Sequence, residues 1–270
     1  MSRAMSKDGT VIAYEASGTG PALIVVDGAL CSRGFGPSPK LAPLLARHFT
    51  VYIYDRRGRG ESTDTLPYAP EREIEDLAAL VAAAGGSASL LGLSSGGALA
   101  LAAAADGLPI DRVVAYEPPY VDDDGQRDAT RFEGQLKRLV AAGDRGGAVK
   151  YFMRDMVGAP GFLVVMMRLM PWIWRKLQAV AHTLPYDAAV MSGFRIPRDR
   201  FARVRTPVLV MNGTKTDERL KNAARALAST IPGARHRELA GQTHNVSPGV
   251  LAPAVVEFLT VVPHSLSDRR

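Results

Sequence analysis

The sequence predicts an α/β protein in which a mostly parallel central sheet carries helices on both faces and a helical segment interrupts the sheet pattern. Short apolar runs bounded by glycine, proline or aspartate alternate with helical stretches, and this alternation is typical of a parallel sheet. The pattern stops near residue 121 and resumes at residue 207. With 270 residues, 47% of them hydrophobic, the chain can bury a large core without disulfides.

The predicted strands are continuous apolar runs, because a parallel strand covered on both faces loses the alternation of polar residues. Five such runs lie at residues 22–26, 49–54, 87–93, 112–116 and 207–211, and residues 235–239 are assigned to a last strand. The helices expected between them span residues 71–84, 96–105 and 218–229. Residues 1–120 and 201–270 are therefore assigned to one core domain.

Residues 121–200 are predicted to form a helical cap inserted into this core. A polar stretch at residues 122–125 begins it, and amphipathic pieces follow at residues 129–142, 148–156, 162–170 and 173–181. The apolar run at residues 161–174 is interrupted by Arg168 and Pro171 and is shorter than the roughly 20 residues that span a bilayer.

Composition limits the partners and the compartment. The net charge of +6 comes with a basic cluster at residues 195–205, but no aromatic-interleaved basic groove accompanies it, so no nucleic-acid partner is expected. A single cysteine, Cys31, excludes an internal disulfide framework and favours a reducing compartment. The first residues lack the apolar core of a signal peptide. These features predict a cytoplasmic protein that does not span a membrane.

Ser94 is the candidate nucleophile. It stands in the sequence GLSSG at residues 92–96, between a predicted strand and a predicted helix, and this context is the one that a Gly-x-Ser-x-Gly turn requires. Small residues at Gly92 and Gly96 permit the tight turn. The backbone N–H of Ser95 would then face negative charge that develops at the reacting carbonyl.

Four motifs in order resemble the α/β-hydrolase fold family over nearly the whole chain. They are DGAL at residues 27–30, DRRGRGES at residues 55–62, GLSSG at residues 92–96 and GQTH at residues 241–244. The resemblance implies this fold and a serine nucleophile. Since relatives that act on haloalkanes or epoxides use an aspartate nucleophile, a serine at position 94 argues against both activities.

A serine nucleophile needs a base, which is usually histidine. In the family this histidine follows the last strand of the sheet, and His244 alone occupies that place. The other histidines are His48, His182, His236 and His264.

Two residues compete for the acid that orients the histidine. The family commonly places it three residues beyond the glycine after the strand at 207–211; counted from Gly213 that position is Thr216, which cannot serve. Asp217, one residue further, is the alternative, although it could equally cap the next helix. We favour Glu117, because a carboxylate at the end of a buried strand is costly without a partner.

A narrower resemblance to one group of enzymes includes the favoured acid, Glu117. Zearalenone-type lactonases are similar to this chain in an Asp-Gly turn, a Ser-Ser-Gly elbow and a Glu-x-Pro after the same strand, matched here by Asp27, Ser94 and Glu117. The oxyanion hole is predicted to combine the N–H of Ser95 with that of Gly28 or Ala29. Asp27 departs from the histidine that the family often has there.

The cap is expected to supply an adaptable wall for a hydrophobic small molecule, since methionine and tryptophan suit such a surface. The residues assigned to this wall are Met166, Met170, Trp172, Trp174 and His182. No metal-ligand spacing or phosphate-binding glycine loop is visible, so no cofactor is expected. The chain is predicted to be an esterase or lactonase. A homodimer is a further option for its assembly. Carbon–carbon bond hydrolysis, cofactor-free chemistry on the same fold and non-catalytic ligand binding are the alternatives.

Overall fold

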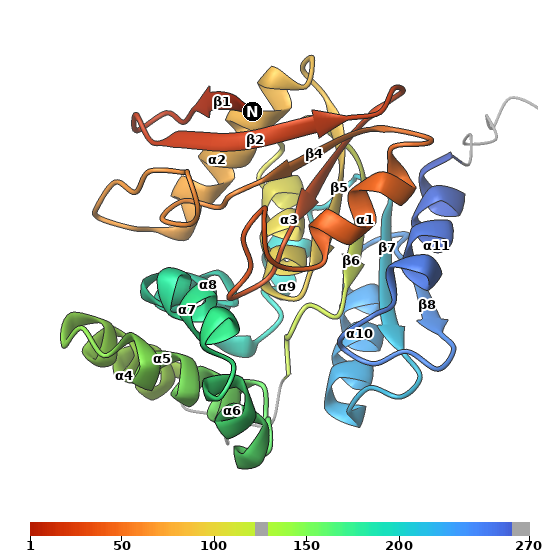
Figure 1. Cartoon of the computed structure of the whole chain (residues 1–270). Coiled ribbons are helices and arrows are strands. Elements are labelled where there is room, and N and C mark those ends of the chain that lie inside the picture. Colours follow the sequence, from red (N-terminus) through yellow and green to blue (C-terminus); the bar gives the residue numbers. More distant parts are fainter. Residues whose placement is uncertain (122–128, 261–270) are drawn as a thin grey trace, which may run out of the picture.

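The computed structural model describes residues 1–121 and 129–260. The predicted polar start of the insertion at residues 122–125 and the candidate His264 lie outside these ranges. Within them, the chain forms one eight-stranded sheet with helices on both of its faces and a group of helices at one side (Figure 1).

The sheet has the order β1-β2-β4-β3-β5-β6-β7-β8. Its strands are β1 (Ser2–Met5), β2 (Val11–Ser17), β3 (Ala22–Val26), β4 (Thr50–Tyr54), β5 (Ala88–Leu93), β6 (Ile110–Tyr116), β7 (Val208–Gly213) and β8 (Arg235–Leu239). The strands from β4 to β8 in this order pair in parallel, whereas β1 and β2 add antiparallel at one edge. The predicted mostly parallel sheet is confirmed.

Helices cover both faces of the sheet. The core on one face includes side chains of α2 (Pro70–Ala83), α3 (Ser95–Ala105) and α10 (Glu218–Thr230), and the other core includes side chains of α1 (Ser38–Leu45) and α11 (Pro248–Thr260). Strand β6 shows how the sheet separates them: Val113 and Ala115 join the first core, while Val114 and Tyr116 join the second. This alternation follows from the two-residue period of a strand.

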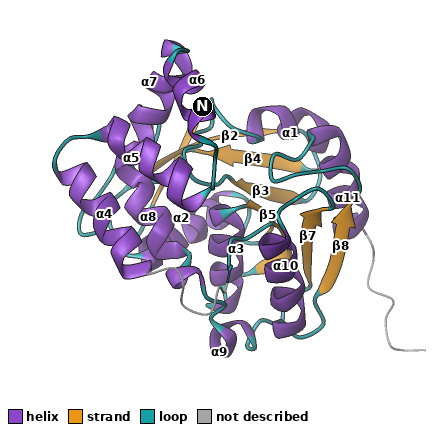
Figure 2. Cartoon of the chain, turned by 90° about the horizontal axis from the view of Figure 1, so that it is seen from below, coloured by secondary structure: helices purple, strands orange, loops and turns teal. Residues whose placement is uncertain are grey.

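The insertion between β6 and β7 is helical. It contains α4 (Ala129–Ala141), α5 (Arg145–Tyr151), a π-helical turn (Phe152–Met156), α6 (Gly161–Arg168), α7 (Pro171–Val180), α8 (Leu184–Val190) and α9 (Arg198–Phe201), with short 3₁₀ turns at Ala181–Thr183 and Ser192–Phe194. A third buried cluster joins most of these helices and includes Leu30 from the loop after β3. Figures 1 and 2 show α4 to α8 together at one side of the sheet.

Several elements differ from the sequence-based expectation. The edge hairpin β1–β2 was not predicted, because its strands alternate buried and exposed residues only weakly. The expected helix at residues 148–156 is α5 followed by the π-helical turn. Arg168 ends α6 and Pro171 begins α7, so these residues divide the long apolar run as predicted. Among the described residues, no helix is long and apolar enough to cross a membrane.

Candidate active site

Ser94 occupies a strained turn between β5 and α3. Its φ of 53° and ψ of −125° lie outside the regions that a serine normally adopts. The glycines on either side make this turn possible: a Cβ on Gly92 would lie 2.5 Å from the Gly96 carbonyl oxygen, and a Cβ on Gly96 would lie 2.0 Å from the Val26 carbonyl oxygen. Ser94 itself is partly exposed. Strain of this kind is typical of functional sites, because the surrounding structure must hold it.

The loop after β3 lies against this turn at Gly28. A Cβ on Gly28 would be 3.0 Å from both the Leu93 carbonyl oxygen and Ser94 Cβ, and 3.6 Å from Ser94 Oγ. The two segments predicted to form the oxyanion hole, at Gly28–Ala29 and at Ser95, are therefore neighbours around the Ser94 side chain. Ala29 also packs against the cluster of buried residues in the insertion.

Glu117 and His244 are in contact. Glu117 follows β6, is fully buried and has a φ of 47°. Its Oε2 lies 2.7 Å from His244 Nδ1, and the histidine side chain is 37% exposed. A carboxylate at Nδ1 favours the tautomer that carries its proton there, which leaves Nε2 free to accept one.

The second oxygen of Glu117 is also held. Oε1 accepts a hydrogen bond of 2.7 Å from the Gly213 backbone N–H and one of 2.6 Å from Thr216 Oγ1. Thr216, at the position where the family commonly has its acid, thus binds Glu117. Asp217 begins α10 instead: it accepts a hydrogen bond from the Arg219 N–H, and about half of its side chain is exposed.

The loop that carries His244 is fixed by its neighbours. Tyr116 Oη donates a 2.6 Å hydrogen bond to the Thr243 carbonyl oxygen. A Cβ on Gly213 would lie 2.2 Å from the Gln242 carbonyl oxygen, so only glycine allows this loop to approach β7 so closely. Of the other predicted histidines, His236 lies 2.7 Å from the Asn212 side chain through its Nε2. His48 is exposed in the turn before β4.

A buried ionic network that sequence reasoning missed links the insertion to this site. Asp187 of α8 is fully buried, and its carboxylate accepts hydrogen bonds from Arg56, Arg59 and Ser95 Oγ at 2.7, 2.6 and 2.7 Å. Arg59 also donates to the Gly28 carbonyl oxygen at 2.7 Å. The network therefore touches both segments of the predicted oxyanion hole. Burial opposes ionisation of Asp187, but the charges of Arg59 and Arg56 hold its pKa below the usual value.

A signal for this network was present in the sequence. Three arginines crowd into residues 56–59, and each is at most 2% exposed in the structure. Arg56 pairs with Glu73 and Arg57 with Asp76, each through two hydrogen bonds. Buried guanidinium groups need carboxylate partners. Asp187, an aspartate inside the apolar segment at residues 184–190, is the sequence signal for such a partner.

Asp27, which stands where the family often has histidine, is 4% exposed. Burial raises the pKa of its carboxyl to about 6, and Oδ1 has no hydrogen-bond partner within the described residues. Burial also raises the pKa of the neighbouring Cys31 thiol to about 12, so Cys31 is not a thiolate at neutral pH.

The residues predicted to line the substrate site separate into two groups. Met166 and Trp172 are 51% and 59% exposed, on α6 and at the start of α7. Met170, Trp174 and His182 are partly buried. Burial and the charge of Arg145 lower the pKa of His182, and its Nδ1 has no partner among the described groups. The exposure of the first pair favours a role at the surface over one inside a closed pocket.

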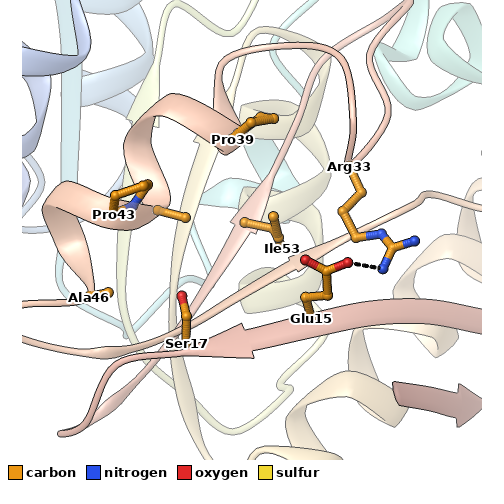
Figure 3. Close-up of a pocket in the computed structure, with 8 residues that line it drawn as sticks. Glu15, Ser17, Arg33, Pro39, Pro43, Ala46 and Ile53 are labelled. Carbon is orange, nitrogen blue, oxygen red and sulfur yellow. Dashed lines mark hydrogen bonds and ion pairs between the residues drawn. The ribbon is translucent and has the colours of Figure 1, made fainter. Parts of the chain in front are cut away.

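A hollow of about 420 Å³ lies elsewhere, between α1, β2 and β4 (Figure 3). Its charged residues are Arg33 and Glu15, which form an ion pair at 2.6 Å, and Arg33 also pairs with Glu61. None of the predicted site residues lines it. Its two charged residues are therefore paired with each other. Among the described residues, no group of three histidine, cysteine or acidic side chains could hold a metal ion.

A parallel sheet with a serine at the turn after its central strand and a histidine after its last strand defines the α/β-hydrolase class of protein. The model of the Alpha/beta hydrolase family matches residues 17–257, and the chain belongs to this family.

Solved structures agree over nearly the whole chain. An alpha/beta hydrolase from Sphaerobacter thermophilus DSM 20745 is 51% identical with a TM-score of 0.89, covering 96% of this chain and 100% of its own. The enol-lactonase from Burkholderia xenovorans LB400 covers 96% of this chain and 100% of its own with a TM-score of 0.73; at 21% identity this likeness shows the fold alone.

Among curated proteins, an N-formylmaleamate deformylase from Pseudomonas putida (strain KT2440) is 38% identical over 117 residues. The matched segment spans 41% of this chain and 41% of the deformylase. Family membership and these relatives support a hydrolase.

Proposed function

We propose that the protein hydrolyses a carboxylic ester or lactone of a hydrophobic small molecule through an acyl-enzyme on Ser94. The observation that carries the proposal is the 2.7 Å contact between His244 Nδ1 and the buried carboxylate of Glu117. That contact orients the imidazole so that its Nε2 can accept a proton from a serine hydroxyl.

In the proposed reaction, Ser94 Oγ attacks the substrate carbonyl carbon while His244 Nε2 removes the hydroxyl proton. The carbonyl oxygen becomes an oxyanion, which the N–H of Ser95 and that of Gly28 or Ala29 stabilise. When the carbon–oxygen bond breaks, His244 returns the proton to the leaving oxygen. Water then attacks the acyl-enzyme with the same base, and the products are an acid and an alcohol, which stay joined when the substrate is a lactone.

Glu117 is the proposed acid, and Asp217 is the less favoured one. Glu117 reaches the histidine and is held by two further hydrogen bonds. The carboxylate of Asp217 is engaged at the start of α10 and with the Arg219 side chain. The lactone part of the proposal rests on the motif similarity to zearalenone-type lactonases at Asp27, Ser94 and Glu117.

A second candidate reaction is hydrolysis of an N-formyl amide, favoured by the 38% identity with the deformylase over 117 residues. The same serine, histidine and oxyanion groups would serve, with an amine as the leaving group. A panel of hydrophobic esters, lactones and N-formyl amides, assayed by acid or formate release, separates the two candidates.

Labelling with a small fluorophosphonate, read by intact mass and peptide mapping, tests the shared chemistry. We expect one adduct, on Ser94, that disappears in His244→Ala and persists in the matched variant His48→Ala. If the folded protein gave no adduct and no turnover on the panel, while hydrophobic ligands raised its Tm, a binding protein would replace the proposal. Turnover confined to diketones would favour carbon–carbon bond hydrolysis.

A further inference from the structure

Helix α6 carries an apolar stripe on its outer side. Its members are Phe162, Val165, Met166 and Leu169, at the i, i+3, i+4 and i+7 spacing of one helix face, together with Trp172 at the start of α7. Their exposed fractions run from 51% for Met166 to 76% for Leu169. The opposite side of α6 buries Val164, which is 3% exposed. A helix needs one apolar side to pack against the protein, and the side with Val164 does so in α6. The stripe is therefore a second apolar side that has no packing partner among the described residues.

The stripe lies at the outer limit of the molecule. Figure 1 shows α6 at the lower end of the insertion, and in Figure 2 α6 and α7 project from the molecule at the top of the view. Contiguous exposed apolar side chains on a soluble domain mark a site of interaction with another apolar surface. Because α6 projects, that surface can be flat and extended.

Basic side chains surround the stripe. Arg168 ends α6, and Arg175 and Lys176 follow Trp172 by one turn of α7. The Lys176 ammonium lies 5.4 Å from the centroid of the Phe35 ring. Arg154, in the π-helical turn, is also exposed. Within the described part of the chain, none of these four forms an ion pair with a carboxylate. From Lys150 to Tyr186, Asp155 is the only acidic residue, whereas five residues, Lys150 included, are Lys or Arg.

We propose that the apolar stripe docks on the surface of an anionic lipid bilayer. Apolar side chains on one helix face, with tryptophan and arginine beside them, are the composition of helices that lie in a membrane interface. Anionic headgroups would neutralise the surrounding arginines and lysine. A second copy of the chain fits less well, since a two-fold contact would bring the same basic residues together.

Vesicle co-sedimentation of the full chain tests this proposal. We expect binding to vesicles of phosphatidylcholine and phosphatidylglycerol at about 7:3, and at least about tenfold weaker binding to phosphatidylcholine alone. Phe162→Ser/Leu169→Ser and Arg168→Gln/Arg175→Gln should each weaken binding by about tenfold. The matched controls Met5→Ser, at a residue that is 72% exposed, and Arg235→Gln should bind like the wild type.

Fluorescence gives a reading that does not depend on these substitutions. The chain has two tryptophans, so Trp174→Phe leaves Trp172 as the only one. Its emission should shift to the blue with anionic vesicles and be quenched by brominated lipid. No shift, or equal binding by the stripe variant and Met5→Ser, would overturn the proposal. So would a dimer in the absence of lipid that the stripe variant abolishes, because the stripe would then belong to a second copy. None of these readings depends on the proposed hydrolysis.

Discussion

Asp187 Oδ1, in the helical insertion, accepts a 2.7 Å hydrogen bond from the side chain of Ser95, the residue that follows the candidate nucleophile. The same carboxylate pairs with Arg56 and Arg59, which also reach the carbonyl oxygens of Asp27 and Gly28. One buried residue of the insertion is therefore connected to both sides of the predicted oxyanion hole.

Removing that charge should destabilise the protein strongly. We expect Asp187→Asn to lower the free energy of unfolding by about 3–5 kcal/mol, because a buried arginine loses its carboxylate partner. Urea unfolding measures the change. The exposed Asp199→Asn is the control, with an expected change within about 0.5 kcal/mol. Equal effects of the two substitutions would show that the network does not stabilise the fold.

Substituting the two candidate acids should have opposite effects on turnover. Glu117→Gln should lower kcat on the best ester or lactone by about 10³–10⁴-fold, because the amide no longer holds the histidine tautomer or stabilises the imidazolium. Asp217→Asn should leave kcat within about twofold and cost at most about 1 kcal/mol of stability as a weakened helix cap. Steady-state kinetics decides between them. Loss of turnover in Asp217→Asn alone would make Asp217 the acid.

Gly28 is expected to be required for its small size. In Gly28→Ala, the new Cβ would press on Ser94 Cβ at 3.0 Å and displace the predicted oxyanion turn. The rate of fluorophosphonate labelling should fall by about tenfold to a hundredfold, since small displacements in an active site are costly. Gly134→Ala, in α4 with nothing within 4 Å, is the control and should add about 1 kcal/mol of stability. Unchanged labelling of Gly28→Ala would remove this turn from the site.

Asp27 should make stability fall as pH rises. Its folded pKa of about 6 exceeds 3.8, the value without burial, so the folded state holds a proton that the unfolded chain has released between these values. Asp27→Asn removes this effect. We compare the free energy of unfolding of Asp27→Asn with that of the wild type at each pH. The variant should gain about 2 kcal/mol relative to the wild type between pH 4.5 and pH 7.

Urea unfolding at the two pH values tests this expectation. Asp155→Asn, at an exposed position, serves as the control and should show no such difference. If the difference in free energy of unfolding between Asp27→Asn and the wild type were the same at both pH values, Asp27 would ionise as freely in the folded protein as in the unfolded chain.

The central sheet and its class are readable from the amino-acid pattern alone. The run at residues 22–26 coincides with β3, because apolar residues between turn-forming residues leave few alternatives to a buried strand. The strand-to-helix context of Ser94 was readable for the same reason. The edge hairpin β1–β2 was not, since a half-exposed strand has a weak pattern and its pairing is decided by a distant partner.

The pairing of distant side chains follows from the folded arrangement of the chain. It put Glu117 beside His244, 127 positions apart, and assigned Thr216 a hydrogen bond to Glu117. It also paired Asp187 with arginines more than 120 positions away. Contacts between distant segments depend on how strands order in the sheet and how the insertion packs on it. Local sequence patterns predict each helix or strand through its periodicity, but they do not predict which distant residue pairs with each buried charge.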